Sequence, residues 1–462
     1  MSDWIPELSS DGSPSYMALA NAIAADIAAG RLSTGERLPP QRTLAKRLGV
    51  HFTTVARGYV EAQNRGLVDS RVGQGTFVTD RSRTRRMQHS HEARPADLTM
   101  NLPPEPTDPD LLERMQAGLE YVAEDIMSVL RYQGFGGTRE DKDAASIWLG
   151  RRAMAPSQER IFVSPGAHAA LVGMLTILAE QGEIVLCEQI TYPGIRSIAA
   201  QLGLKLLGLP MDEDGIIPQA FRDACTTMKP KAIYLNPTLQ NPTTLTIPIE
   251  RRKEIAAVAR EFNVPIIEDD AYGFIPARGQ QPAPFATLAP ELTWHIAGLS
   301  KCIGAGLRLA FVIVPNTRSA WPFASTLRAS TVMASPLTAA LATRWIKDGT
   351  ATMLLRSIRS ETAERYKLAT EILPENSFRG SPLSFSIWVP LPALWTRTAF
   401  VEHLRSTGIG VVASDAFVAG GTAPEAVRIC LGGPTKRQEI KSALEYIEHA
   451  MTESPALAST FL

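Results

Sequence analysis

The sequence lacks several features, and each absence excludes a class of protein. It has no uninterrupted apolar run of ~18 or more residues, and it opens on acidic residues instead of a basic stretch followed by an apolar core. We therefore expect neither a membrane span nor a secretory signal. Only four cysteines are present, and none forms a Cys-x-x-Cys pair or has a histidine partner at zinc spacing. This pattern predicts reduced thiols, a cytoplasmic protein and no metal site.

Net charge is also absent, since 47 basic residues balance 47 acidic ones. Taken alone, this balance argues against a partner as acidic as DNA. The distribution of charge changes the interpretation. Residues 31–94 hold 13 Lys and Arg against 5 Asp and Glu, residues 1–30 hold none against four, and residues 95–462 hold 34 against 38. One basic segment lies between two acidic ones, so we expect contact with a polyanion there.

Residues 14–78 have the pattern of a winged helix-turn-helix domain of the α+β class. Apolar residues recur at helical spacing from Tyr16 to Ala29, and further helices are predicted from Thr43 to Leu48 and from about Thr53. Residues 67–78 alternate like two short strands around a glycine turn. We expect the third helix to bury Val55, Tyr59 and Val60 and to expose Thr53, Thr54, Arg57 and Glu61.

The rest of the chain is predicted to form a linker and a second domain. Residues 79–97 are basic, nearly free of apolar side chains and without a period, which is typical of a flexible linker. We expect a domain over residues 98–462, in which strands and helices alternate from about 150 to 315. This alternation favours an α/β fold with a mostly parallel sheet. The mixed pattern from about 320 to 462 favours a smaller α+β subdomain.

Residues with reactive or hydrogen-bonding side chains follow several of the predicted strands. Open parallel sheets bind their ligands at this position, beyond the carboxyl ends of the strands. These side chains include an amine, a carboxylate, an amide and two aromatic rings, in Lys301, Asp269, Asn241, Tyr192 and Tyr272. Residues 166–168 open a helix and offer unpaired amides to a phosphate. This set suits pyridoxal 5'-phosphate, whose aldehyde needs an amine, whose pyridinium nitrogen needs a carboxylate and whose phosphate needs amides and a guanidinium.

On these residues the chain resembles two known families. Residues 98–462 are similar to the fold-type I, aminotransferase-like proteins that use pyridoxal 5'-phosphate, and residues 14–78 resemble the DNA-binding domain of the GntR superfamily. In this order the two halves resemble the MocR-type (GabR/PdxR-like) bacterial transcriptional regulators over nearly the whole chain. The resemblance implies pyridoxal 5'-phosphate as cofactor, operator DNA as partner and a head-to-tail homodimer.

The resemblance also assigns roles around the cofactor ring. Lys301 would form the internal aldimine, and Asp269 would pair with the pyridine nitrogen. Tyr272 and Asn241 would hydrogen-bond the phenolic oxygen of the ring, and Tyr192 would stack on its face. Alternatively, Tyr192 is an aromatic residue of the hydrophobic core without a role in cofactor binding.

Further roles concern the phosphate and the amino ligand. The phosphate would be surrounded by Gly166, Ala167, His168, Ser300 and Arg308, with Tyr132 reaching in from a second subunit. Arg428 would grip a ligand carboxylate through two parallel hydrogen bonds. Alternatively, Arg428 pairs with a structural acid, His168 is a polar packing residue and Tyr132 is an interface aromatic. The sequence departs from the family at Gly298, Thr244 and Ala310.

In the DNA-binding half, the resemblance implies contacts to phosphates and major-groove edges from Arg42, Thr53, Thr54 and Arg57. The wing would approach the minor groove with Arg71, Gly73 and Gly75. Linker arginines at 83, 85 and 86 would add salt-dependent affinity. His51 and Phe52 stand where the family commonly has Ser and Arg, so a helix cap and a phosphate contact are expected to differ.

Three functional hypotheses follow. The first is a regulator that senses pyridoxal 5'-phosphate, or an amino compound that displaces Lys301 to form an external aldimine with it. The second is a working aminotransferase with an autoregulatory DNA-binding module. The third is a repressor with a vestigial cofactor pocket. It is supported by Gly298 and Thr244, where the sequence departs from the family.

Overall fold

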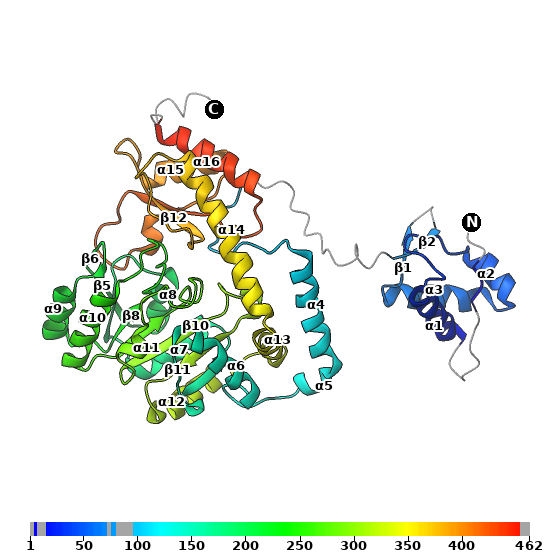
Figure 1. Ribbon diagram of the computed structural model, residues 1–462, viewed down its shortest axis with the longest axis horizontal. Coiled ribbons are helices and arrows are strands. Elements are labelled where there is room, and N and C mark those ends of the chain that lie inside the picture. The colour runs from blue at the N-terminus through cyan, green and yellow to red at the C-terminus, as the bar shows by residue number, and fades with distance from the viewer. Residues whose placement is uncertain (1–3, 7–14, 72–74, 80–95, 453–462) are drawn as a thin grey trace. The chain divides into compact units, whose positions relative to one another are not determined.

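The computed structural model describes residues 4–6, 15–71, 75–79 and 96–452, and the chain divides into two compact units, Met1–Ala93 and Arg94–Leu462 (Figure 1). Most of the predicted linker, with its arginines at 83, 85 and 86, and Gly73 of the wing lie outside the described residues. No helix in the described ranges combines the length and apolarity needed to cross a membrane.

The first unit is a winged helix-turn-helix. Its elements are α1 (Ser15–Ala28), α2 (Gln41–Leu48), α3 (Phe52–Asn64), β1 (Val68–Arg71) and β2 (Gly75–Val78). The strands pair antiparallel, with Val68 opposite Val78, and form the wing. Apolar residues from all three helices meet in one core that includes Leu19, Leu44 and Val55. This domain matches the fold predicted from the sequence.

One inward-facing prediction for α3 is wrong. The Val60 side chain is 55% exposed, whereas Gly58 is buried and faces α1. A Cβ at Gly58 would lie 2.7 Å from Cδ2 and 3.1 Å from Cβ of Leu19, so the glycine lets the two helices approach closely without displacing Leu19. Val55, Tyr59 and Ala62 form the buried stripe, because steps of three and four residues stay on one helix face and Val60 lies about 100° from Tyr59.

The second unit is built on a seven-stranded sheet in the described part of the chain, in the order β3-β11-β10-β9-β8-β4-β5. β11 is antiparallel to both of its neighbours, and the other pairs are parallel. The strands are β3 (Ile161–Ser164), β4 (Ile184–Glu188), β5 (Lys205–Leu209), β8 (Ala232–Leu235), β9 (Ile266–Asp269), β10 (Thr293–Gly298) and β11 (Ala310–Ile313). The α/β class and the mostly parallel sheet are confirmed.

Helices and short elements surround this sheet. They are α4 (Pro109–Glu124), α5 (Ile126–Val129), α6 (Arg139–Leu149), η1 (Gly150–Arg152), η2 (Gln158–Arg160), α7 (Ala167–Leu178), α8 (Pro193–Gln201), α9 (Pro218–Met228), α10 (Ile249–Phe262), α11 (Phe285–Leu288), η3 (Ala305–Leu307), α12 (Thr317–Thr331) and α13 (Pro336–Lys347). A small hairpin is formed by β6 (Met211–Asp212) and β7 (Gly215–Ile216). Many of the strand residues are fully buried, as expected for a sheet covered on both faces.

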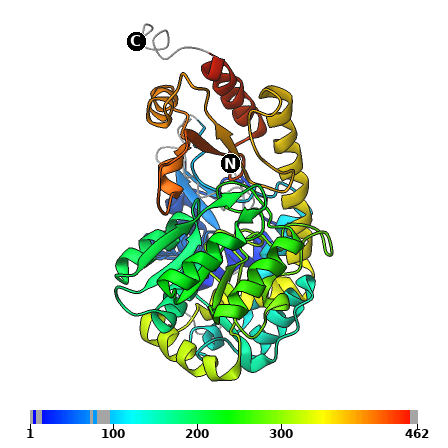
Figure 2. The same ribbon diagram turned by 90° about the vertical axis from the view of Figure 1, so that its left-hand side faces the viewer.

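A smaller α+β subdomain completes the second unit. It contains the antiparallel sheet β12-β14-β13 and adjacent helices, with β12 (Ser386–Pro390), α15 (Arg397–Ser406), β13 (Val412–Ala413), η4 (Ser414–Phe417), β14 (Ala426–Cys430) and α16 (Arg437–Thr452). The long helix α14 (Thr350–Ile372) leads into it from beside α13 (Figure 1). In Figures 1 and 2 this orange-to-red subdomain lies at one end of the unit.

The small subdomain does not start at about residue 320, as the sequence pattern had predicted, because that residue lies in α12. α12 packs on α7, and its Phe323 contacts Phe162 of β3 and Trp294 of β10 edge-on, at centroid distances of 5.2 and 6.0 Å. The first residues of this stretch therefore belong with the large sheet. Helical periodicity shows which face of α12 is apolar but not which layer covers that face.

Candidate functional site

A cavity of about 140 Å³ lies at the edge of the large sheet where the parallel strands end. Its lining consists of Ala167, His168, Tyr192, Asn236, Asn241, Asp269, Ala271, Tyr272, Gly298, Ser300, Lys301 and Arg308. The residues predicted to hold the cofactor are all in this lining except Gly166 and Tyr132. Arg308 reaches the same edge because it precedes the antiparallel strand β11.

The start of α7 and Arg308 form the predicted phosphate seat. Gly166 adopts a φ of +87° just before the helix, which favours glycine, and a Cβ there would lie 3.4 Å from Nη2 of Arg308. The guanidinium is therefore beside the unpaired amides of the helix start, where an anion is stabilised. Burial and the Arg308 charge both lower the pKa of His168, which favours the neutral imidazole.

Gly298 leaves room in this seat for the serine that the related family carries. The nearest atoms to a Cβ at this position are Cα of Ala271 at 3.8 Å and Cβ of Ala167 at 3.9 Å, which are ordinary contact distances. We expect Gly298→Ser to bind pyridoxal 5'-phosphate about tenfold more tightly, because one added hydrogen bond to a charged phosphate is worth about 1.5–3 kcal/mol. Equilibrium titration measures this. Unchanged affinity would place the phosphate elsewhere.

Asp269 ends β9 with one carboxylate oxygen unused. Its Oδ2 accepts a hydrogen bond from the Tyr234 hydroxyl at 2.9 Å, whereas its buried Oδ1 has no partner among the described residues. Burial, reinforced by the neighbouring Asp270 charge, raises the pKa of Asp269 to about 6. A pyridinium N–H would satisfy Oδ1 and restore the charged form, so this orphaned atom fits the cofactor.

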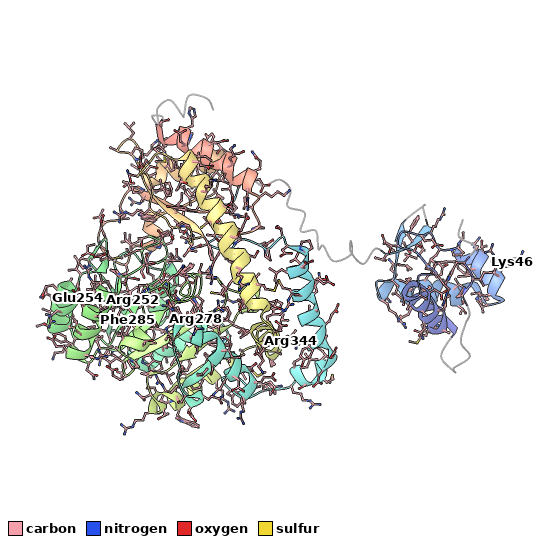
Figure 3. All side chains as sticks on the ribbon, in the orientation of Figure 1. Lys46, Arg252, Glu254, Arg278, Phe285 and Arg344 are labelled. Atoms are coloured by element: carbon pink, nitrogen blue, oxygen red, sulfur yellow. The ribbon has the colours of Figure 1, made fainter. Side chains whose placement is uncertain are left out.

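The strand beneath Asp269 is fixed by a buried ionic network around Glu268. The Glu268 carboxylate accepts bonds from the amides of Phe285 and Ala286, at 2.8 and 3.0 Å, and from Nδ1 of His295 at 2.8 Å. Arg252 lies 3.9 Å away, and its guanidinium stands 5.9 Å from the centroid of the Phe285 ring. Both residues are labelled in Figure 3. Because both carboxylate oxygens of Glu268 accept hydrogen bonds from neighbouring elements, the network helps to hold the end of β9 in position.

Lys301 is half-buried and bonded to main chain. Its Nζ donates to the carbonyl oxygen of Asn101, and burial lowers the pKa of Lys301 to about 8. A larger share of the side chain is therefore the neutral, nucleophilic amine than in a surface lysine. The hydroxyl of Tyr272 accepts a bond from Nδ2 of the same Asn101 at 3.0 Å, and burial raises the pKa of Tyr272.

Arg428 comes to the cavity rim from β14 of the small subdomain. Its Nη1 donates to Oδ1 of Asn241 at 2.8 Å and its Nη2 to the carbonyl oxygen of Thr99 at 2.5 Å, while its buried Nε has no partner. Its guanidinium stands 4.9 Å from the Phe417 ring centroid. The partners found for Arg428 among the described residues are thus an amide oxygen and a main-chain carbonyl and not a carboxylate.

The two aromatic predictions have different outcomes. Tyr192 precedes α8, is half-buried and lines the cavity, and burial raises its pKa. Tyr132 is 82% exposed and does not line the cavity of its own chain. A contact of Tyr132 with the cofactor therefore requires a second copy of the chain.

The segment of residues 96–103 contacts the site although no sequence motif predicted it; we call it the entry segment because it leads from the linker into the second unit. Its carbonyls at Thr99 and Asn101 accept the bonds from Arg428 and Lys301 described above. Main-chain bonds join it to the small subdomain, from Leu98 to Gly410 and from Cys430 to Leu98, both at 2.9 Å. Asn236 and Tyr234, which support Asp269, were also missed. No local motif marks any of these contacts, which form only when distant segments pack.

The DNA-binding unit presents its predicted contact residues on α2 and α3. Thr53 and Arg57 are exposed and Thr54 is half-buried, and the Arg57 guanidinium lies 4.3 Å from the ring centroid of Tyr16. His51 replaces the usual serine as helix cap, with its Nδ1 accepting from the Thr53 amide at 3.4 Å. In the wing, the backbones of Arg71 and Gly75 pair across the hairpin.

Comparisons with known proteins agree with both halves. Residues 95–447 match the aminotransferase class I and II family, and residues 15–78 match the bacterial regulatory proteins of the gntR family. An uncharacterized HTH-type transcriptional regulator of Bacillus subtilis is 29% identical over 97% of both chains. The probable rhizopine catabolism regulatory protein MocR of Rhizobium meliloti is 26% identical, over 77% of this chain and 76% of its own.

Among solved structures, Pyrococcus horikoshii kynurenine aminotransferase, in complex with PMP, superimposes with a TM-score of 0.70 at 20% identity, covering 78% of this chain and 91% of that one. An α-aminoadipate aminotransferase from Thermus thermophilus gives 0.68 at 20% identity, over 79% and 93%. The aminotransferase family depends on pyridoxal 5'-phosphate, and Asp269, Lys301 and Arg308 fit that cofactor. The chain belongs to the aminotransferase class I and II family and, with its gntR-type domain, is a MocR-type transcriptional regulator.

Proposed function

We propose that the protein is a cytoplasmic transcriptional regulator whose DNA affinity responds to pyridoxal 5'-phosphate, or to an amino compound that reacts with it. One observation carries the proposal. The two cations that would bind ligand, Lys301 and Arg428, are both bonded to carbonyls of the entry segment, at Asn101 and Thr99. The same segment continues toward the DNA-binding unit in the sequence, so the ligand site and that unit share a covalent connection.

Each cavity residue has a defined task in this proposal. Pyridoxal 5'-phosphate supplies an aldehyde that reacts reversibly with primary amines. Lys301 provides the amine, Asp269 Oδ1 accepts a hydrogen bond from the pyridine nitrogen, and Tyr272 and Asn241 donate to the phenolic oxygen. Tyr192 covers the ring. The phosphate is held by the helix start with Gly166, Ala167 and His168 and by Ser300 and Arg308.

Ligand binding changes the bonds of the entry segment. Lys301 Nζ cannot hold both the cofactor aldehyde carbon and its present bond to Asn101 in unchanged geometry. Arg428 bonds to Thr99 and Asn241 through two of its five N–H groups, so a carboxylate held by two parallel N–H groups, including the unpartnered Nε, would bind the same guanidinium that contacts the entry segment. The ligand-free and ligand-bound proteins therefore favour different positions of the entry segment, which is the differential affinity that coupling requires.

A homodimer completes the site in this proposal. Tyr132 is exposed in the single chain, in a stretch of α4 and α5 and the following loop that also exposes Leu119, Tyr121, Ile126, Met127, Leu130 and Phe135. Exposed apolar groups gathered on one segment are typical of a protein interface. We propose that this surface pairs head-to-tail with a second copy and brings Tyr132 to the partner's phosphate seat.

A second candidate function, aminotransferase activity, is favoured by one contact. The 2.8 Å bond between Arg428 and Asn241 ties the carboxylate-binding cation to the cofactor-binding amide, which is the arrangement needed to orient an amino acid for proton transfer. Multiple turnovers with an amino donor and an oxo acid would support this second function. A single half-reaction without turnover would leave the regulator as the function of the domain.

DNA binding itself is tested on α3. We expect Arg57→Ala to weaken binding to a duplex from the region upstream of the protein's own gene by about tenfold or more, because loss of one arginine contact to DNA costs about 1–3 kcal/mol. Arg31→Ala is the control, since Arg31 is an exposed arginine of the same unit that pairs with Asp26 and lies outside α3. Equal retardation of both variants and the wild type would contradict this assignment.

A further inference from the structure

Phe52 begins the recognition helix with its ring partly in water. It is 41% exposed, although Val55, Tyr59 and Ala62 of the same helix are buried in the core. The first residues of such a helix are those that meet base edges in the major groove. Phe52 has no hydrogen-bonding group, so its side chain can donate a hydrogen bond neither to a base edge nor to a phosphate.

Two arginines line the groove that contains this ring. Phe52 forms part of a groove of about 290 Å³ together with Arg37, Arg42 and residues of β2, and no carboxylate is in the described lining. The Arg42 guanidinium lies 5.8 Å from the Phe52 ring centroid. Arg37 crosses the base of the wing at Gly75, where a Cβ would come within 2.7 Å of its Nε. The groove thus suits the phosphate backbone, with the ring at its edge.

The Phe52 ring is an exposed apolar group at the start of α3. The neighbouring hydroxyl, Oγ1 of Thr53, lies 2.7 Å from Nδ1 of His51 and is engaged within the protein. The cap is therefore complete without Phe52, and the ring is not required to hold the helix end. A side chain that neither fills the core nor closes the helix is available for an intermolecular contact.

We propose that Phe52 recognises thymine by packing against its 5-methyl group in the major groove, while Arg37 and Arg42 hold the flanking phosphates. The thymine methyl is the one apolar group among the unmodified base edges of that groove, and a phenyl ring is among the side chains that contact it. This inference rests on DNA binding by the gntR-type domain and is independent of cofactor sensing.

The test removes the methyl group from the DNA and the ring from the protein. Full-length protein selects its preferred duplex from a random library, and that duplex is then made once with thymine and once with uracil in its place. We expect wild type to bind the thymine duplex about fourfold more tightly for each contacted methyl, the ratio that corresponds to about 0.8 kcal/mol. Phe52→Ala should bind both duplexes equally, because the group that senses the methyl is gone.

Val60→Ala is the matched control, because it truncates another exposed apolar residue of α3 and should keep the thymine preference. For each protein we take the ratio of its affinities for the thymine and uracil duplexes. Comparing this ratio between wild type and the two variants cancels any effect of uracil on DNA stiffness. Circular dichroism verifies that the variants fold. A thymine preference that is absent in the wild type, or that persists unchanged in Phe52→Ala, overturns the proposal. Failure to select any preferred sequence overturns it as well.

Discussion

Replacing Lys301 with alanine abolishes covalent capture of pyridoxal 5'-phosphate. Wild-type protein mixed with the cofactor gains the absorbance band of a lysine-bound aldehyde, and Lys301→Ala shows only the spectrum of free cofactor. The expected loss is complete, because Lys301 is the one lysine in the lining of the cavity in the described residues. Lys253→Ala is the control, since this exposed lysine pairs with Glu250 far along the sequence from the site. A band that survives in Lys301→Ala would contradict the assignment.

The same absorbance has a defined pH dependence. Burial lowers the pKa of Lys301 to about 8, so the folded protein releases the amine proton more readily than an ordinary lysine with a pKa near 10.4. The rate of capture should therefore rise about tenfold per pH unit below 8 and level off above it. A rate that continues to climb beyond pH 9 would mean that the reacting amine is solvent-exposed.

Displacing the entry segment uncouples the ligand site from DNA. A Cβ at Gly432 would lie 1.7 Å from the carbonyl oxygen of Leu102, so Gly432→Ala must push the segment away from β14. We expect the ratio of DNA affinities with and without ligand to fall from about fivefold or more to near one, because the segment no longer has two ligand-dependent positions. Gel retardation of the full-length protein measures the ratio.

Two further variants separate uncoupling from a loss of folding. Gly150→Ala is a matched glycine substitution, since nothing lies within 4 Å of its Cβ position and its φ of −58° suits alanine. It should leave the ratio unchanged. Asn101→Ala removes only the bond to Tyr272 and should lower the ratio partly. Full coupling in both Gly432→Ala and Asn101→Ala would show that the signal does not pass through the entry segment.

Local sequence patterns predicted the elements and the edge of the sheet where the site lies. Lys301, Asp269 and Arg308 each adjoin a strand at that edge, and strand order alone brings such residues together in an open α/β sheet. The two families were also identified from these motifs and their order. Local patterns were sufficient to predict these strands because a buried parallel strand is a short apolar run that can be recognised within its own segment.

Contacts between distant segments could not be predicted in the same way. The bond from Arg428 to Thr99 joins residues that are more than three hundred positions apart, and its geometry depends on how the small subdomain meets the large sheet. The bond from Lys301 to Asn101 uses a backbone carbonyl, a group that every residue carries and that no motif marks. Val60 was predicted to be buried because it is apolar. In the structure Gly58 faces the core instead, and apolar character alone does not show which face of the helix is buried.

The central claim is that occupancy of the Lys301 cavity changes the affinity for DNA. The most direct measurement is the dissociation constant of full-length protein for a duplex from its own upstream region, taken without cofactor, with pyridoxal 5'-phosphate, and with cofactor plus candidate amines. We expect a change of about fivefold or more between at least two of these states, and no change in Lys301→Ala. The same dissociation constant in every state of the wild type would contradict it.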